Sequence, residues 1–506
     1  MKRKAFIYLL FVLTLIALLM SACSYSPPDP EPTLTLDPGS SLPTATQPKP
    51  TVEETPVQEN TLKPANTPSP ENAERIQYQI LAELDYPNRQ VWVDETIIIP
   101  HPSNQPLNEL ILVVPPNAWW GVFQLLDISW VGAEQIDDYS LDGVQLTIPL
   151  SEPWHPGESR ELNILYYLDL PAQNAREGFG PSPFGFTAIQ TNLVDWYPMV
   201  PEYQEEGGWI IHNPWIFGEY LVYPQADFEV ILDVENPALV VAASSLAERD
   251  GDRFHYYLEE ARNFVFSISP DYVVLEDVVN GTIVYAYVFP PYLVPGRAAF
   301  KATLESLALY NDLFGSYLQP SLTMVQADFN HGMEYEGLYF QSRAFFDTYN
   351  GTEKSYLITI AAHETAHQWW YGQVANDQAM EPWLDEAICT FSELIYYERL
   401  YPQSVDWWWA TRVDFYEPIG VINRSIYDYG EFIDQYLAYR NATYLQGAKF
   451  LNVLRITVGE EATISFLGEY AEIFKNQIAT GEDFFSLLGE YVDVESLPWL
   501  GEYFSE

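Results

Sequence analysis

The chain has 506 residues, enough for about three domains of ordinary size. Hydrophobic residues make up 48% and aromatic residues 15%, which excludes a wholly disordered protein. The formal net charge of −48, from 23 basic and 71 acidic residues, excludes a protein that binds the nucleic-acid backbone. Because Cys23 and Cys389 are the only cysteines, a disulfide framework and a cysteine-rich zinc module are excluded as well.

The first 22 residues have the features of a lipoprotein signal peptide. Basic residues at positions 2–4 precede an apolar run over Ala5–Met20, which is short for a membrane span of about 20 residues but typical of a signal-peptide core. Small residues then lead to Cys23, and the pattern resembles a bacterial lipoprotein signal. We expect residues 1–22 to be removed and Cys23 to carry a lipid anchor at the cell surface, outside the cytoplasm. An uncleaved N-terminal anchor is the alternative.

The chain changes character after the predicted signal peptide. Residues 23–73 are rich in Pro, Ser and Thr and hold one aromatic residue, Tyr25, so they predict a disordered tether. Apolar and polar residues then alternate, as in Ile76–Leu84, which predicts β-strands. Similar runs recur up to Pro290 without a convincing helix. We therefore predict an antiparallel β domain over residues 74–290.

After residue 290 the spacing of the apolar residues changes to a helical period. Arg297–Phe314 predicts an amphipathic helix, Leu322–Ala327 predicts a strand, and helices dominate from Lys354 onward. Residues 291–506 are therefore predicted to form an α+β, mostly helical domain. The predicted fold class is multidomain, with a β domain followed by a domain that carries the chemistry.

The strongest signal is the pattern His-Glu-x-x-His, formed by His363, Glu364 and His367 within a helix predicted over Tyr356–Tyr371. Positions i and i+4 lie on one face of a helix, so both imidazoles can bind one metal ion. Glu364 projects beside them, where a carboxylate can take a proton from a metal-activated water. Zinc favours such ligands. Two structural histidines on a helix face are the alternative.

A catalytic zinc ion needs a third protein ligand and an open position for water. Glu386 follows His367 by 19 residues and stands near the start of a helix predicted from Leu384 to Arg399. If the two helices pack as antiparallel neighbours, Glu386 returns to the histidines. We therefore predict one Zn²⁺ per chain, bound by His363, His367 and Glu386. Asp385 is the competing carboxylate, and we expect it to have a supporting or capping role.

Taken together, these residues resemble the gluzincin aminopeptidases of the aminopeptidase N and leukotriene hydrolase family. Gly-Met-Glu-Tyr at residues 332–335 is similar to that family's exopeptidase motif, Gly-x-Met-Glu-Asn. Tyr-Leu-Gln-Gly at residues 444–447 is similar to its catalytic-tyrosine motif, Tyr-x-Lys-Gly. Trp-Tyr-Pro at residues 196–198 and the strands after it resemble the family's N-terminal β domain. The resemblance covers roughly residues 75–490 and implies a thermolysin-like catalytic domain.

The resemblance implies zinc-dependent hydrolysis of peptide bonds that releases N-terminal residues from peptides. Glu364 is then the general base, and the Tyr444 hydroxyl stabilises the oxyanion. Gly332 and Met333 are expected to lie on an edge strand, where an extended peptide can pair by main-chain hydrogen bonds. Glu334 is expected to bind the free α-ammonium of the substrate. Beyond peptide substrates and the lipid anchor, no feature of the sequence indicates an obligate protein partner.

The sequence also departs from the family pattern. Tyr335 replaces the Asn of the exopeptidase motif, and Gln446 replaces the Lys of the tyrosine motif. The chain ends at Glu506, so we expect it to lack the large C-terminal helical domain of many relatives and to have a more open cleft. A zinc endopeptidase with an open cleft is therefore one alternative function, and a non-catalytic peptide-binding lipoprotein is another.

Overall fold

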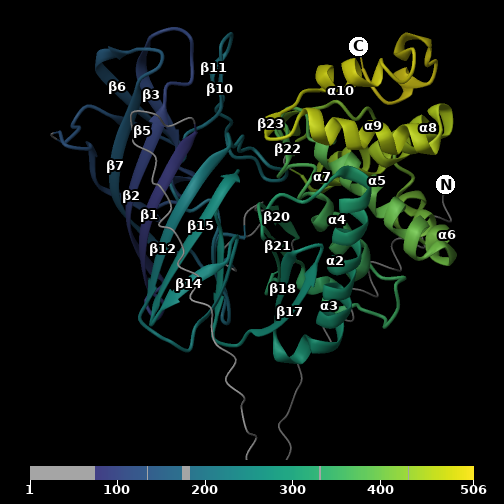
Figure 1. Ribbon diagram of the computed structural model, residues 1–506, viewed down its shortest axis with the longest axis horizontal. Coiled ribbons are helices and arrows are strands. Elements are labelled where there is room, and N and C mark those ends of the chain that lie inside the picture. Colours follow the sequence, from purple (N-terminus) through teal and green to yellow (C-terminus); the bar gives the residue numbers. More distant parts are fainter. Residues whose placement is uncertain (1–74, 134, 174–182, 330–331, 431, 506) are drawn as a thin grey trace, which may run out of the picture. The chain divides into compact units, whose positions relative to one another are not determined.

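The computed structural model describes residues 75–505 except 134, 174–182, 330–331 and 431 (Figure 1). The predicted signal peptide and tether, with Cys23, lie outside the described residues. No helix within the described part combines the length and apolar character that a membrane span requires. Sheets dominate up to residue 288 and helices dominate afterwards, which confirms the predicted fold class.

The N-terminal region is built on a 7-stranded sheet with the order β14-β15-β12-β1-β2-β7-β4. Its neighbouring strands are antiparallel except β1 and β12, which pair in parallel because a long crossover rather than a hairpin connects them. Side chains alternate along each strand, so one face of the sheet is buried and forms a core. The strands are β1 (Ile76–Asp85), β2 (Gln90–Pro100), β4 (Phe123–Trp130), β7 (Ser159–Asp169), β12 (Ala226–Val234), β14 (Ala247–Asp250) and β15 (Arg253–Ala261).

Smaller sheets complete this region. A 3-stranded sheet has the order β3-β6-β5 and a 4-stranded sheet the order β13-β16-β9-β8. Trp154 and Trp196 are fully buried in the shared core, so these tryptophans are packing residues. The strands are β3 (Leu107–Val113), β5 (Ser140–Asp142), β6 (Gln145–Trp154), β8 (Gly185–Phe186), β9 (Thr191–Leu193), β10 (Tyr203–Gln204), β11 (Gly208–Trp209), β13 (Val240–Ala243) and β16 (Phe266–Ser269).

The second region contains a 5-stranded sheet with the order β17-β18-β19-β21-β20. The hairpin of β17 (Val273–Val279) and β18 (Thr282–Val288) belongs to this sheet, because β18 pairs in parallel with β19 (Ser321–Gln326). Sheet membership therefore changes after β16 and not at the predicted boundary of residue 290. Strand periodicity shows which face of a strand is buried, but not which sheet the strand joins. β20 (Met333–Tyr335) pairs with β21 (Leu338–Gln341) and lies at the edge of the sheet.

Helices α2, α4 and α5 pack together in the core of the second region (Figure 1). Helices α8, α9 and α10 contribute buried residues to the same core, and two segments, Trp409–Val413 and Asn441–Gln446, are π-helical. The helices are α2 (Leu293–Phe314), α3 (Arg343–Asp347), α4 (Tyr356–Ala366), α5 (Trp383–Leu400), α6 (Val405–Trp408), α7 (Ile433–Arg440), α8 (Gly447–Val458), α9 (Glu460–Ile473) and α10 (Gly481–Leu488). Short strands β22 (Val374–Ala375) and β23 (Gln477–Ile478) pair in parallel.

Helix α4 ends earlier than the sequence predicts. The predicted helix extends to Tyr371, whereas α4 ends at Ala366 with His367 as its C-cap. Tyr371 has a φ of 136°, outside the helical region, and the Gly372 N–H donates to the His367 carbonyl oxygen at 2.9 Å. A stretch without Gly or Pro looks helical in sequence, but this local turn directs the chain away after the second histidine.

Arg262 fixes the N-terminal region against the second region. Its side chain is buried and donates hydrogen bonds to three backbone carbonyl oxygens, those of Gly372 at 3.2 Å, Tyr223 at 3.2 Å and Gln477 at 3.0 Å. Gly372 lies just after the histidine helix. The contact therefore positions the end of the segment that carries the two histidines.

Candidate active site

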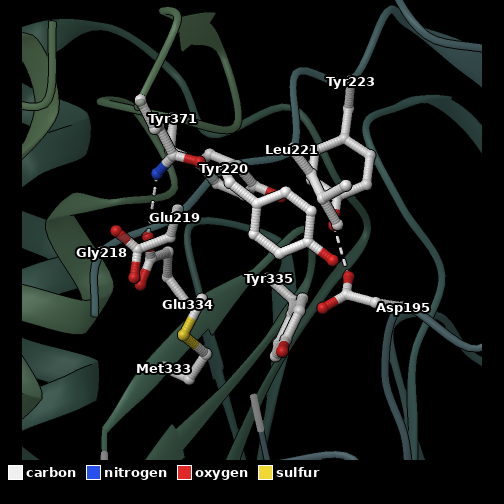
Figure 2. A pocket seen from close by; sticks show the side chains of 11 residues that line it. Asp195, Gly218, Glu219, Tyr220, Leu221, Tyr223, Met333, Glu334, Tyr335 and Tyr371 are labelled. Carbon is white, nitrogen blue, oxygen red and sulfur yellow. Dashed lines mark hydrogen bonds between the residues drawn. The ribbon is translucent and has the colours of Figure 1, made fainter. Parts of the chain in front are cut away.

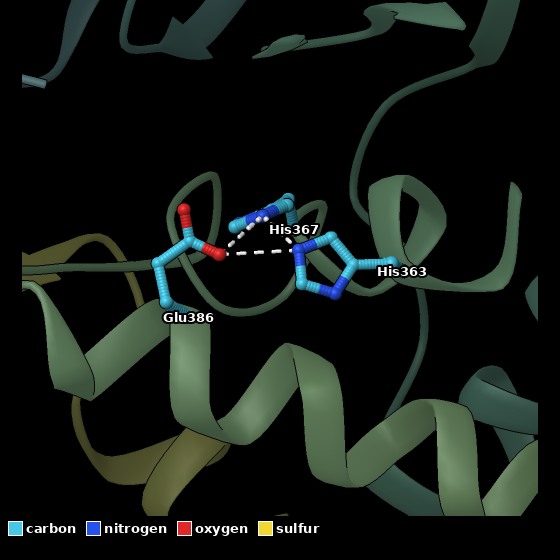
Figure 3. A group of neighbouring side chains, drawn as sticks. All are labelled: His363, His367 and Glu386. Atoms are coloured by element: carbon cyan, nitrogen blue, oxygen red, sulfur yellow. Dashed lines mark hydrogen bonds and ion pairs between the residues drawn. The ribbon is translucent and has the colours of Figure 1, made fainter. Parts of the chain in front are cut away.

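Three buried side chains from α4 and α5 meet at one point (Figure 3). His363 Nε2 lies 3.1 Å from Glu386 Oε2 and 3.2 Å from His367 Nε2. His367 Nε2 lies 3.6 Å from the same Glu386 oxygen. Ligand bonds of about 2.0–2.1 Å in a tetrahedral arrangement put the ligand atoms about 3.3 Å apart. The spacing of the two imidazole nitrogens and one carboxylate oxygen therefore fits a zinc ion.

A hydrogen-bond acceptor behind His367 and an ion-pair partner behind His363 position the two rings. His367 Nδ1 lies 3.1 Å from the Trp370 carbonyl oxygen, and His363 Nδ1 lies 2.8 Å from Glu393 Oε1. An N–H directed at an acceptor leaves Nε2 as the lone-pair nitrogen that faces a metal. The turn after α4 supplies the first acceptor, and α5 supplies the second. Because α4 ends at Ala366, the following turn can place the Trp370 carbonyl oxygen beside His367.

Glu393 is a supporting residue that the sequence analysis missed. It is fully buried and accepts hydrogen bonds from Arg412 at 2.7 Å and from Trp408 Nε1 at 2.9 Å. Burial disfavours its charge, but Arg412 and His363 together outweigh this effect and lower the pKa of Glu393. Glu393 follows Glu386 by two helical turns, so both side chains lie on the same face of α5. That spacing is the signal that could have identified it.

Glu386 is ready to act as an ionised ligand. Burial alone would raise its pKa, but hydrogen bonds with His363 and His367 lower the pKa of Glu386 to about 2. Asp385, the competing carboxylate, accepts hydrogen bonds from the Glu386 N–H and from the Gln378 side chain, both at 2.7 Å. These contacts suit the supporting role expected for Asp385.

Glu364 lies beside the histidines in a cavity of about 340 Å³. Its Oε2 has no hydrogen-bond partner among the described residues. Burial, partly offset by the two histidines, raises the pKa of Glu364 to about 8. A Cβ atom at Gly332 would lie 2.6 Å from Glu364 Oε1, so a side chain at position 332 would displace this carboxylate. Gly332 therefore leaves room for a carboxylate that can exchange a proton in the cavity.

Tyr444 reaches the metal site from the π-helical segment Asn441–Gln446. Its hydroxyl donates a hydrogen bond to Glu386 Oε1. The ring stacks on His363 with 6.0 Å between the ring centroids and 12° between the planes. The structure thus brings the predicted tyrosine into direct contact with a predicted metal ligand.

A second carboxylate stands next to Glu334. Oxygen atoms of Glu219, Glu334 and Glu386 lie within 4.8 Å of one another, and Figure 2 shows Glu219 and Glu334 close together beside Met333. Glu334 also accepts a hydrogen bond from Gln378 at 3.1 Å. Burial raises the pKa of Glu334 and, with the charge of Glu334, that of Glu219. Three crowded carboxylates form a site that favours a cation.

Glu219 was not predicted from the sequence. It lies between β11 and β12, in a segment with no metal-ligand spacing and no helical pattern. Only the packing of this segment beside β20 brings its carboxylate to the site. An isolated acidic residue in a chain with 71 acidic residues carries no local signal.

Residues 298–500 match the Peptidase family M1 domain. All of the predicted zinc ligands, the exopeptidase segment and Tyr444 lie within that range. The second region of the chain is therefore similar to peptidase family M1. This match and the similarity to curated aminopeptidases agree with the aminopeptidase N-type resemblance, and they indicate zinc as the cofactor.

The curated relatives match this chain over only part of their own length. Endoplasmic reticulum aminopeptidase 2 of Homo sapiens is 27% identical over 226 residues, which cover 41% of this chain and 23% of the relative. Aminopeptidase N of Lactobacillus helveticus is 23% identical over 295 residues, which cover 54% of this chain and 34% of the relative. The chain thus spans about a quarter to a third of these relatives.

A solved structure extends the likeness to both regions of the fold. It is an M1 zinc metallopeptidase mutant from Deinococcus radiodurans bound to a Tyr-Ser-Ala substrate. The TM-score is 0.59 at 17% identity, over 83% of this chain and 92% of that chain. The likeness shows that the two proteins share a fold.

Proposed function

We propose that the protein is a zinc aminopeptidase that releases N-terminal residues from peptides outside the cytoplasm. The observation that carries the proposal is the position of Glu334, whose carboxylate lies beside the zinc ligands and next to Glu219. A free α-ammonium group is a cation that these carboxylates can bind through charge-assisted hydrogen bonds. A peptide with a blocked N-terminus lacks that charge.

The position of β20 at the edge of the sheet suits the binding of an extended peptide. Among the described residues, β20 is the last strand of the 5-stranded sheet and pairs with β21 on one side. A substrate strand can add to such an edge by main-chain hydrogen bonds. Because Glu334 stands in β20, the same strand would align the peptide and hold its N-terminus. The first peptide bond then faces the metal ligands.

The chemistry follows from the positions of the catalytic side chains. Bound zinc supplies a Lewis acid that polarises a carbonyl and lowers the pKa of water to about 7. In its ionised form Glu364 accepts the water proton and passes it to the leaving amine, a role typically worth ~10²–10⁴ in rate. Its Oε2 has no hydrogen-bond partner among the described residues and so is available for that proton. In the structure the Tyr444 hydroxyl contacts Glu386. During the reaction it donates a hydrogen bond to the oxyanion that develops on the scissile carbonyl.

The decisive experiment compares matched peptides with free and N-acetylated termini. The parent protein, loaded with zinc, should cleave the free peptide with a kcat/KM about tenfold to a hundredfold higher, because a charge-assisted contact is worth about 1.5–3 kcal/mol. Glu334→Ala should lose most of this preference. Glu490→Ala removes an exposed carboxylate that is distant from Glu334 in the sequence, and it serves as the matched control.

Equal rates on the two peptides in the parent would overturn the aminopeptidase assignment and favour the endopeptidase alternative. A Glu334→Ala variant that keeps the full preference for the free amine would assign the amine site elsewhere. Measuring zinc content in both variants separates loss of the amine contact from loss of the metal.

We also propose that the protein is a lipoprotein anchored at the cell surface. Support comes from the basic residues at positions 2–4, the apolar run and the small residues before Cys23. Cys23→Ser should either release the enzyme from the membrane fraction or leave the signal peptide attached. Mass spectrometry of the parent's N-terminus checks this, and an unmodified chain that retains residues 1–22 would favour an uncleaved anchor.

A further inference from the structure

Arg440 is a cation in the active-site cavity, and it has no carboxylate partner among the residues that the structure describes. It lines the cavity together with Glu364, Glu386 and Tyr444. Among the described residues no carboxylate oxygen lies within 4.0 Å of its guanidinium, and its buried Nε has no hydrogen-bond partner. In a chain with 23 basic and 71 acidic residues, such a cation is unusual.

The contacts that Arg440 does make hold it in place and leave it able to bind an anion. Its guanidinium carbon lies 4.1 Å from the centre of the Tyr416 ring, a cation–π contact. One terminal nitrogen donates to the Asn441 side-chain oxygen at 2.8 Å. By contrast, Arg412, the other arginine of the cavity, is paired with Glu393 at 2.7 Å.

Arg440 and Glu334 lie toward opposite ends of one face of α4. Tyr356, Ile360, His363, Glu364 and His367 are the residues of α4 and its C-cap that line the cavity. At the C-terminal end, oxygen and nitrogen atoms of Glu334 and His367 approach within 4.8 Å. At the N-terminal end, the Tyr356 hydroxyl lies 3.4 Å from that of Tyr416, on which Arg440 stacks.

The charges of the cavity therefore match those of a short peptide. The carboxylates stand at one end, the metal ligands stand in the middle, and the guanidinium stands at the other end. A peptide held by its α-ammonium at Glu334 directs its C-terminus toward Arg440. A guanidinium binds a carboxylate through paired N–H···O bonds, which gives both affinity and orientation.

We propose that Arg440 binds the C-terminal carboxylate of the substrate and so selects short peptides with a free C-terminus. This inference rests on the proposed aminopeptidase function and names its substrate class. From His363 back to Tyr356 is seven helical residues, or about 10 Å along the axis. An extended chain covers about 3.3–3.6 Å per residue. Two to three residues thus fit beyond the scissile bond, so tripeptides and tetrapeptides are the preferred substrates.

The test measures the preference for a free C-terminal carboxylate. Ala-Ala-Ala and its C-terminal amide are compared as substrates, with a length series from two to eight residues. The parent should favour the free acid about tenfold to a hundredfold in kcat/KM, the value of a hydrogen bond to a charged group. Arg440→Gln should bring the ratio of kcat/KM for the acid to kcat/KM for the amide to near one. Arg399→Gln, which removes an exposed arginine paired with Glu460 at 2.6 Å, is the control.

A binding measurement separates failure of this inference from failure of the proposed function. Calorimetry on Glu364→Gln compares the dissociation constants of Ala-Ala-Ala and its amide without turnover, and the free acid should bind about tenfold or more tightly. If the free acid binds more tightly than the amide but the parent cleaves neither peptide, the result supports carboxylate binding by Arg440 and contradicts the proposed aminopeptidase function. Cleavage of both peptides at equal kcat/KM by the parent overturns the role of Arg440, even if Arg440→Gln does not fold. Equal losses on acid and amide in a folded Arg440→Gln variant would show that the residue is only structural.

Discussion

Replacing Glu95 by Gln is expected to stabilise the protein increasingly as the pH rises from about 5. Glu95 lies on β2 and is completely buried in the core of the N-terminal region. Neither of its carboxylate oxygens has a hydrogen-bond partner among the described residues. Burial raises the pKa of Glu95 well above its usual range, and the nearby Tyr166 hydroxyl offsets this only in part. The folded protein therefore keeps Glu95 protonated where the unfolded chain releases the proton.

The sign of the effect follows from proton linkage. An unfolded glutamic acid has a pKa of about 4.3, so below that pH both states carry the proton and Glu95 makes no pH-dependent contribution. Above it, and up to the raised pKa of the folded state, folding takes up one proton. The free energy of unfolding then falls by about 1.4 kcal/mol per pH unit relative to a chain with a neutral side chain at position 95. A glutamine cannot ionise, so Glu95→Gln removes this slope.

The assay is urea unfolding of the parent and of Glu95→Gln at half-unit steps between pH 4 and pH 8, followed by tryptophan fluorescence. The buried Gln amide adds a cost of its own, but that cost does not depend on pH and leaves the slope unaffected. Glu109→Gln, at an exposed position of β3, is the control. A stability difference between parent and Glu95→Gln that stays constant from pH 5 to pH 7 would refute the assignment of a neutral buried carboxyl.

Three further predictions concern the zinc site. Elemental analysis should find one zinc ion per chain in the parent, a much lower content in Glu386→Ala, and full content with no turnover in Glu364→Gln. Tyr444→Phe should keep the fold and the zinc and lower kcat by ~10²–10³, the usual cost of one oxyanion donor. Glu393→Gln should weaken zinc binding by about 10- to 100-fold in a competition titration with a chelator, because His363 loses the carboxylate that orients it.

Each of these predictions has a contrary result. Less than a tenth of an equivalent of zinc in the parent after loading would contradict the metal site. A Tyr444→Phe variant with near-normal kcat would assign oxyanion stabilisation to another group. Unchanged zinc affinity in a folded Glu393→Gln variant would show that His363 is oriented without Glu393. Thermal melts of all variants provide the folding control.

Local sequence determined the metal-binding part of the site. His363 and His367 are four residues apart, and helical geometry alone places such a pair on one face. Glu386 stands at the start of the next long helix, so the return of the chain in an antiparallel helix was enough to predict that it meets the histidines. Their atoms lie 3.1–3.6 Å apart in the structure. The spacing of residues along a regular helix depends only on local sequence, so it places these side chains on one face in any fold that contains the helix.

Tertiary structure alone decided which isolated charged residues complete the site. Glu219 and Arg440 come from separate segments with no metal-ligand spacing, and only the packing of the chain places both in the cavity. The same limit applies to the β17–β18 hairpin, whose alternating pattern is that of a strand in either sheet. A charged residue has the same local sequence signal on a solvated surface as in a cavity. Its desolvation and its partners, which determine its chemistry, depend on residues far away in the chain.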